Sequence, residues 1–176
     1  MRAEPTANPE FSFIVHPSEI GGKEQIYELE ADSVQREALA RRFDLLEIES
    51  FKARMALNRR HDGATLRLLG VVKARVIQRC VVTLEPVEND VEHRFESFFS
   101  EENHSDRNEV TLDDDVEPLD GDVLDLGEIA SEELFLALDP YPRLPGVALT
   151  DFLPQADFED DNKHPFAALA ALKGKK

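Results

Sequence analysis

The stretch from Ser50 to Val82, SFKARMALNRRHDGATLRLLGVVKARVIQRCVV, decides the fold. Its first part alternates apolar and polar residues, which is the period of a strand with one buried face. The apolar positions there are Phe51, Ala53, Met55 and Leu57. The pair Asp62-Gly63 then predicts a tight turn, because glycine adopts positive φ without strain. A hairpin of two strands is therefore expected.

The second strand of this hairpin is expected to run from about Thr65 to Val82, with two different faces. Its even-numbered positions are mostly apolar, with Gly70 and Gln78 as exceptions; the apolar ones are Leu66, Leu68, Val72, Ala74, Val76 and Cys80. Its odd-numbered positions carry several arginines and lysines. Since side chains alternate across a strand, one face is expected in the core and the other in solvent.

The sequence on either side of the hairpin predicts three more strands and two helices. The strands are expected at residues 11–15, 25–30 and 91–99. One helix should follow Asp32, which can form a capping box with Gln35, and its apolar stripe is expected to be Val34, Ala38 and Phe43.

The second helix should follow Asp125, with Glu128 completing a capping box. Its expected buried face is Leu126, Ile129, Ala130, Leu134 and Ala137. Together these patterns predict an α+β fold with an antiparallel sheet of four to six strands, two or three helices, an acidic loop insert and a short C-terminal helix.

The expected domain organisation has one folded unit with two tails. Residues 1–8 are expected to be a flexible N-terminus, and residues 9–149 a single α+β domain. Within that domain, residues 101–122 are too acidic to fold alone, so a mobile loop is expected there. Residues 150–176 should form an acidic linker and a short helix with Pro165 in its first turn.

Composition limits the class of protein. The single cysteine excludes an internal disulfide, and no apolar stretch approaches the roughly 20 residues that span a bilayer, so a cytoplasmic protein without membrane contact is expected.

The net charge is −17, and it is uneven: residues 1–80 hold 13 basic and 12 acidic residues, whereas residues 81–176 hold 7 basic and 25 acidic residues. A local basic face could therefore meet phosphate, or the acidic half could hold a basic protein.

The side chains that most often carry chemistry show no recognisable site pattern. Cys80 shares its strand face with apolar residues, and the run Val81-Val82-Thr83 favours continuation of the strand, which would place Thr83 on the other face. A buried packing role is therefore favoured over a nucleophile or a metal ligand. The histidines lack metal-ligand spacing, and the acidic run 113–122 does not fit a calcium loop. We expect no catalytic residue, metal, cofactor or small-molecule substrate.

The cations on the solvent face of the hairpin are the candidate nucleic-acid-binding residues. Two lie on the first strand, two at the turn and four on the second strand: Lys52, Arg54, Arg59, Arg60, Arg67, Lys73, Arg75 and Arg79. Such a row could follow a phosphate backbone. The alternative is an ordinary solvated sheet face whose cations pair with acidic neighbours such as Glu47 and Glu49.

Three blocks of the sequence resemble the YceD family, the large ribosomal RNA subunit accumulation proteins. They are GVVKARVIQRCVVTLEPVEND at residues 70–90, LDLGEIASEELFLALDPYP at residues 124–142 and HPFAALAALKGKK at residues 164–176. The resemblance covers roughly residues 10–173 and implies a role in accumulation of the large-subunit ribosomal RNA. The implied partner is ribosomal RNA or a basic large-subunit ribosomal protein, and the implied role is non-catalytic.

The chain departs from this family in its cysteines. Many members carry Cys-x-x-Cys where this chain reads Cys80-Val81-Val82-Thr83, and further cysteines where it reads PRLPGVALTD. The resemblance therefore implies that this chain binds no zinc, since a structural site needs four ligands. The terminal helix presents Phe166, Leu169 and Leu172, which either pack on the sheet or contact a partner.

Overall fold

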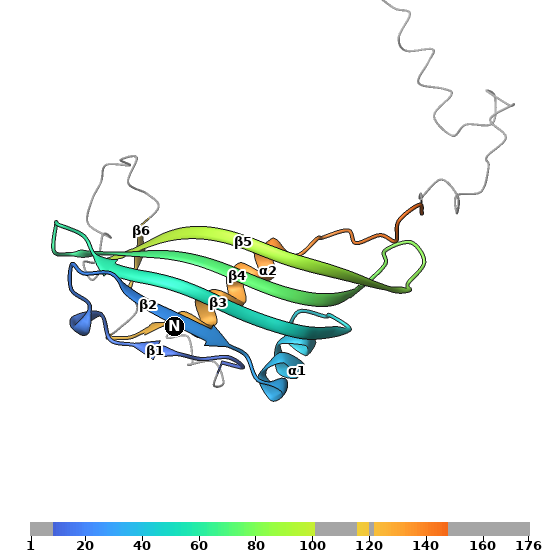
Figure 1. Cartoon of the computed structure of the whole chain (residues 1–176), viewed down its shortest axis with the longest axis horizontal. Coiled ribbons are helices and arrows are strands. Elements are labelled where there is room, and N and C mark those ends of the chain that lie inside the picture. The colour runs from blue at the N-terminus through green and yellow to red at the C-terminus, as the bar shows by residue number, and fades with distance from the viewer. Residues whose placement is uncertain (1–8, 101–115, 120–121, 148–176) are drawn as a thin grey trace, which may run out of the picture. The chain divides into compact units, whose positions relative to one another are not determined.

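The computed structural model describes residues 9–100, 116–119 and 122–147. The first compact unit of the chain ends at Leu144, and its described residues form two sheets and two α-helices (Figure 1). The larger sheet has the strand order β2-β3-β4-β5-β6, and β1 and β7 form a second, two-stranded sheet. The strands are β1 Ile14–Val15, β2 Gln25–Glu30, β3 Glu47–Arg59, β4 Thr65–Arg79, β5 Pro86–Ser100, β6 Val116–Pro118 and β7 Leu124–Asp125.

The predicted α+β class is confirmed, and the long strands β3, β4 and β5 dominate the sheet. Strands β2 to β5 are antiparallel neighbours. Short turns connect β3 to β4 and β4 to β5, whereas helix α1 lies between β2 and β3. Strand β6, however, pairs parallel to β5, so the sheet is mixed rather than purely antiparallel. This strand falls inside the stretch 101–122 that the sequence predicted as a loop, and that part of the prediction was wrong.

The two α-helices begin where the capping residues predicted. Helix α1, Ser33–Arg42, starts after Asp32, which accepts hydrogen bonds from the backbone N–H groups of Val34 and Gln35 in a complete capping box. Its apolar stripe was predicted only in part: Phe43 packs against the core, but Val34 is 72% exposed, and the buried residues are Leu39 and Ala40.

Helix α2, Leu126–Ala137, starts after Asp125, which accepts from the N–H groups of Gly127 and Glu128. The Glu128 carboxylate pairs with Arg42 at 2.6 Å instead of completing a capping box with Asp125. Arg42 also meets Glu10 at 3.1 Å, so one guanidinium joins the N-terminal segment, α1 and α2. A short 3₁₀ helix, Pro17–Glu19, lies between β1 and β2.

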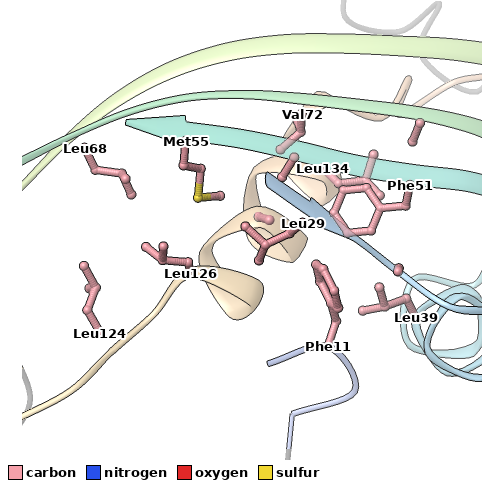
Figure 2. Packing of buried hydrophobic residues seen from close by; sticks show 14 of the residues in the cluster. Phe11, Leu29, Leu39, Phe51, Met55, Leu68, Val72, Leu124, Leu126 and Leu134 are labelled. Atoms are coloured by element: carbon pink, nitrogen blue, oxygen red, sulfur yellow. The ribbon is translucent and has the colours of Figure 1, made fainter. Parts of the chain in front are cut away.

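One face of β3 and β4 builds the core against α2 and the N-terminal segment. Figure 2 shows Phe51, Met55 and Leu68 extending from the sheet toward α2. These side chains and their neighbours Leu57, Leu66, Val72 and Val76 are at most 1% exposed. From α2 come Leu126, Ala130 and Leu134, and Phe11 packs edge-on against Phe51 at 5.4 Å between ring centroids. The parity prediction for this face is confirmed.

Gly70 and Gln78 are the two residues that interrupt the apolar alternation of β4. Their contacts with β5 and with the segment after α2 explain both. Gly70 lies opposite Phe95, whose ring occupies the space that a Cβ atom at position 70 would need. Gln78 is buried, and its amide donates to the Asp139 carbonyl and accepts from the Asn89 side chain, both at 2.9 Å. Neither residue is therefore a defect in the sheet.

In the part of the chain that the structure describes, no helix has the length and apolar character to cross a membrane. The predicted N-terminal tail at 1–8, the acidic stretch 101–115 and the terminal helix at 165–172 fall outside the described residues. The predicted domain boundaries therefore stay a prediction.

Candidate nucleic-acid interface

The candidate interface is the open face of the larger sheet, which we define as the face opposite the core. Its cations lie mainly on the two central strands, β3 and β4, as the alternation in the sequence predicted. Cross-strand register arranges them in rows. One row joins Glu30, Lys52, Lys73 and Glu92, and the next joins Glu28, Arg54, Val71 and Arg94. The basic strands β3 and β4 thus lie between the more acidic strands β2 and β5.

Five of the predicted cations form ion pairs with carboxylates of the flanking strands β2 and β5. The pairs are Lys52–Glu30 at 3.0 Å, Arg54–Glu28 at 3.5 Å, Arg67–Glu96 at 2.6 Å, Lys73–Glu92 at 3.0 Å and Arg75–Asp90 at 2.8 Å. In each pair both side chains are substantially exposed, so each contributes little to stability. The charges of the open face are thus largely matched within the sheet.

These contacts change the titration of the carboxylates. The pKa of Asp90 is lowered, first by its hydrogen bond from Arg75 and then by the charge of that guanidinium. The pKa of Glu92 is lowered in the same way by Lys73. Both carboxylates are therefore ionised at neutral pH, and they compete with any phosphate for these cations.

The partners differ from those that the sequence indicated. Glu49 does approach Arg75, at 3.9 Å, but Asp90 is much closer. Glu47 lies opposite Ile77, and no ion pair to a basic residue is recorded for it within the described ranges. The real partners come from β2 and β5. They could be found only from the strand order and register, which no local pattern in the sequence encodes.

The turn between β3 and β4, which we call the tip, differs from the rest of the face. Arg59 is a structural residue: its guanidinium donates to the carbonyls of Pro17, Ile20 and Gly63 at 2.6–3.0 Å. Arg60 is exposed, and its guanidinium lies 5.4 Å from the ring centroid of Phe98. The sequence reasoning missed Phe98, because its position beside the tip follows from the pairing of β4 with β5.

A hollow of about 520 Å³ opens at the tip. Arg59, Arg60 and Arg67 line it together with Phe98 and Glu96. Gly63 has the positive φ of 76° that the sequence predicted for this turn. Arg79 lies at the other end of β4, so the structure separates it from the tip cations by the length of the strand. The eight predicted cations therefore form a central group, a tip group and one distant residue.

The turn after β4 holds Cys80, and here one expectation was wrong. Strand β4 ends at Arg79, and the chain turns through residues 81–83 rather than continuing as a strand. The Thr83 N–H consequently lies 3.4 Å from the Cys80 sulfur, on the same side as that sulfur. Leu84 adopts a positive φ of 66°, and its N–H donates to the Cys80 carbonyl at 3.0 Å, which closes the turn despite the β-branched residues.

Cys80 itself is fully buried, as predicted. The Thr83 hydroxyl, followed by the Thr83 N–H, lowers the pKa of the Cys80 thiol to about 6, against the opposing effect of burial. The turn is fixed to a later segment by a hydrogen bond from the Val81 N–H to the Pro142 carbonyl at 2.9 Å. Within residues 9–100, 116–119 and 122–147 there is no group of three or more His, Cys, Asp or Glu side chains placed to hold a metal ion.

Comparison with known proteins identifies the family. The family model described as large ribosomal RNA subunit accumulation protein YceD matches residues 68–173. The chain belongs to the YceD family. The match includes the block ending at Cys80, the α2 block and the Pro165-Phe166 block, so the resemblance seen in the sequence is confirmed, although the match starts only at Leu68. Searches of curated proteins and of solved structures found no match.

Membership of the YceD family connects the chain with accumulation of the large-subunit ribosomal RNA. The family description names a process and no reaction. The matched residues begin at Leu68 within β4 and include β5, β6 and α2, so β5 and the part of β4 from Leu68 onward lie inside the YceD match. Phe166, Leu169 and Leu172, the predicted partner-binding residues, lie within the match but outside the described residues.

Proposed function

We propose that this YceD-family protein is a non-catalytic assembly factor that supports accumulation of large-subunit ribosomal RNA by contacting RNA through the cations of β3 and β4. The observation that carries the proposal is the placement of these cations on one face of two adjacent strands, opposite the core. A regular row of exposed cations on a rigid sheet can neutralise several phosphates at once.

The carboxylates of β2 and β5 set the strength of this contact. Exposed ion pairs contribute about 0–1 kcal/mol each, so a phosphate can replace a carboxylate as the partner of a lysine or arginine at little cost. The displaced carboxylates stay nearby and repel the phosphates. Weak, salt-sensitive binding is therefore the expected behaviour, which suits a factor that must later leave the ribosomal subunit.

A salt titration of RNA binding tests the proposal. The variant Lys73→Glu/Arg75→Glu reverses two cations at the centre of the open face, both of them away from the hollow at the tip. The control Arg41→Glu/Arg143→Glu makes the same change in net charge at exposed positions on α1 and after α2. Direct contact predicts that the slope of log K against log salt falls by about 1.4–1.8 in the first variant, because each of the two lost phosphate contacts removes about 0.7–0.9.

The outcome that contradicts the proposal is equally definite. Equal slopes for the two double variants would show that only net charge matters, and the open face would lose its assigned role. A second candidate function would then gain support: an adaptor for a basic large-subunit ribosomal protein. It is favoured by the net charge of −17 and by the carboxylates that already occupy the sheet cations. Absence of RNA binding at low salt, together with co-purification of a basic ribosomal protein, would select it.

A further inference from the structure

The hollow at the tip has the size and lining of a ligand site. Its volume of about 520 Å³ falls in the range of pockets that take small organic molecules, about 300–1,000 Å³. It lies on the open face, at the end of the sheet where β3 turns into β4. Its lining combines an aromatic ring with several cations, whereas the centre of the open face offers only aliphatic and charged side chains.

The Arg60 guanidinium lies over the Phe98 ring in this hollow, and we call this pair the platform. Phe98 lies directly opposite Arg67 in the β4–β5 register, which places its ring among the charged side chains of the open face. The Arg60 guanidinium is 5.4 Å from the centre of that ring, a cation–π contact. Nucleic-acid bases stack both on aromatic rings and on guanidinium planes. The exposed guanidinium of this pair therefore offers a plane on which a base can stack.

The two carboxylates in the hollow are already engaged by other groups. Asp62 accepts hydrogen bonds from the N–H groups of Ala64 and Thr65, at 3.0 and 2.9 Å, and its pKa is lowered chiefly by the Thr65 N–H. Glu96 accepts from Arg67 at 2.6 Å. The Arg60 guanidinium contacts the Phe98 ring, and its charge is the smallest of the contributions that lower the pKa of Asp62. Arg60 therefore brings an exposed positive charge beside the aromatic ring, where a phosphate can meet it.

The backbone of the tip is fixed before any ligand arrives. The Arg59 guanidinium donates to three backbone carbonyls of nearby segments, and the Arg59 N–H donates to the Gly21 carbonyl at 2.8 Å. The Asp62 carboxylate accepts from the Ala64 N–H and so closes the turn. A preformed site loses less conformational entropy on binding than one that must be ordered by its ligand.

We propose that the tip hollow binds an unpaired nucleotide of RNA, with the base on the Arg60–Phe98 platform and its phosphate beside Arg60 and His61, which also lines the hollow. This inference rests on the proposed function and adds a substrate preference to it. In duplex RNA each base is stacked between its neighbours and cannot reach the platform, whereas a loop or a single strand supplies a free base. The centre of the open face would then bind phosphates without regard to pairing, and the tip would select unpaired segments.

The experiment compares two RNA ligands and three variants of the full chain. The ligands are a fluorescein-labelled 12-nucleotide single strand and the same strand annealed to its complement, measured by anisotropy at one salt concentration. The variants are Phe98→Leu, Arg60→Gln and, as the matched control, Arg79→Gln, which removes one exposed cation at the far end of β4. Thermal unfolding verifies that each variant is folded.

For Phe98→Leu and Arg60→Gln we expect at least about fivefold weaker binding of the single strand and less than about twofold change for the duplex. Arg79→Gln should change both ligands alike. The inference is overturned if the tip variants weaken both ligands equally, or if they lose no more than the Arg79 control. In those cases wild-type binding persists and the proposed function stands. Absence of binding of either RNA to the wild-type protein would instead refute the proposed function, and the inference with it.

Discussion

The contact between Gly70 and Phe95 gives the sharpest prediction about the fold. A Cβ atom at position 70 would lie 2.1 Å and 2.2 Å from two ring carbons of Phe95, far inside the ordinary contact distance. In Gly70→Ala the ring must therefore leave its place, and the half-buried Phe95 side chain loses most of its contact with the sheet. We expect the free energy of unfolding to fall by about 2–3 kcal/mol, the usual effect of overpacking a core.

The physical reason can be isolated with a double-mutant cycle. Phe95→Ala alone should lower the free energy of unfolding by about 2–3 kcal/mol, because a half-buried ring is lost and Gly70 is left uncovered. In the double variant the new methyl group occupies the vacated space, so its loss should be near that of Phe95→Ala alone. Urea unfolding then gives a coupling of about 2 kcal/mol. Losses that add to within about 0.5 kcal/mol would refute the explanation, because the two residues would then act independently.

Two other predictions concern close contacts elsewhere. Gly127→Ala places a Cβ atom 2.7 Å from the Phe11 carbonyl oxygen and 2.8 Å from the Ser12 Cα. Because the new methyl group meets backbone atoms, the free energy of unfolding should fall by more than about 3 kcal/mol. Adding Phe11→Ala should not restore the stability, since it removes only a side chain. A restored stability in urea unfolding would contradict this explanation. For Cys80, whose pKa is lowered to about 6 from the ordinary 9.0, thiolate absorbance should titrate near pH 6 in the folded protein, with Cys80→Ala as the blank. The contribution of this thiolate to the stability should be complete above pH 9.0, decline as the pH falls and be absent below about 6. Thr83→Val should raise the midpoint of the thiolate titration. An unchanged midpoint would exclude the Thr83 hydroxyl as the cause of the lowered pKa.

Local sequence patterns predicted the elements and faces of the hairpin well, because they depend on alternation within one strand. The buried positions Met55, Leu66 and Val72 could be assigned from parity alone. Helix α1 was harder. Its start was evident from Asp32, but its buried side was not, because a ten-residue helix with few apolar residues buries only a narrow strip. That strip, around Leu39, is selected by contact with β3.

The features that could not be predicted all depend on partners far away in the sequence. The ion pair between Arg75 and Asp90 and the packing of Phe95 over Gly70 both require the β4–β5 register. The turn after Cys80 contains β-branched residues and no glycine, so its local preference is for a strand. The chain turns there because hydrogen bonds to Cys80 and from Val81 to Pro142 outweigh that preference.

The same register determines both the packing of the sheet and the proposed nucleotide platform. Opposite Phe95 lies Gly70 on the core face, and three residues later Phe98 lies opposite Arg67 on the open face. A slip of one residue would turn every β5 side chain to the other face, removing the ring from the hollow and placing carboxylates against the core. Selection for a packed core therefore maintains the tip as well. It follows that substitutions which loosen the β4–β5 pairing should weaken binding of unpaired RNA even where they touch no residue of the hollow.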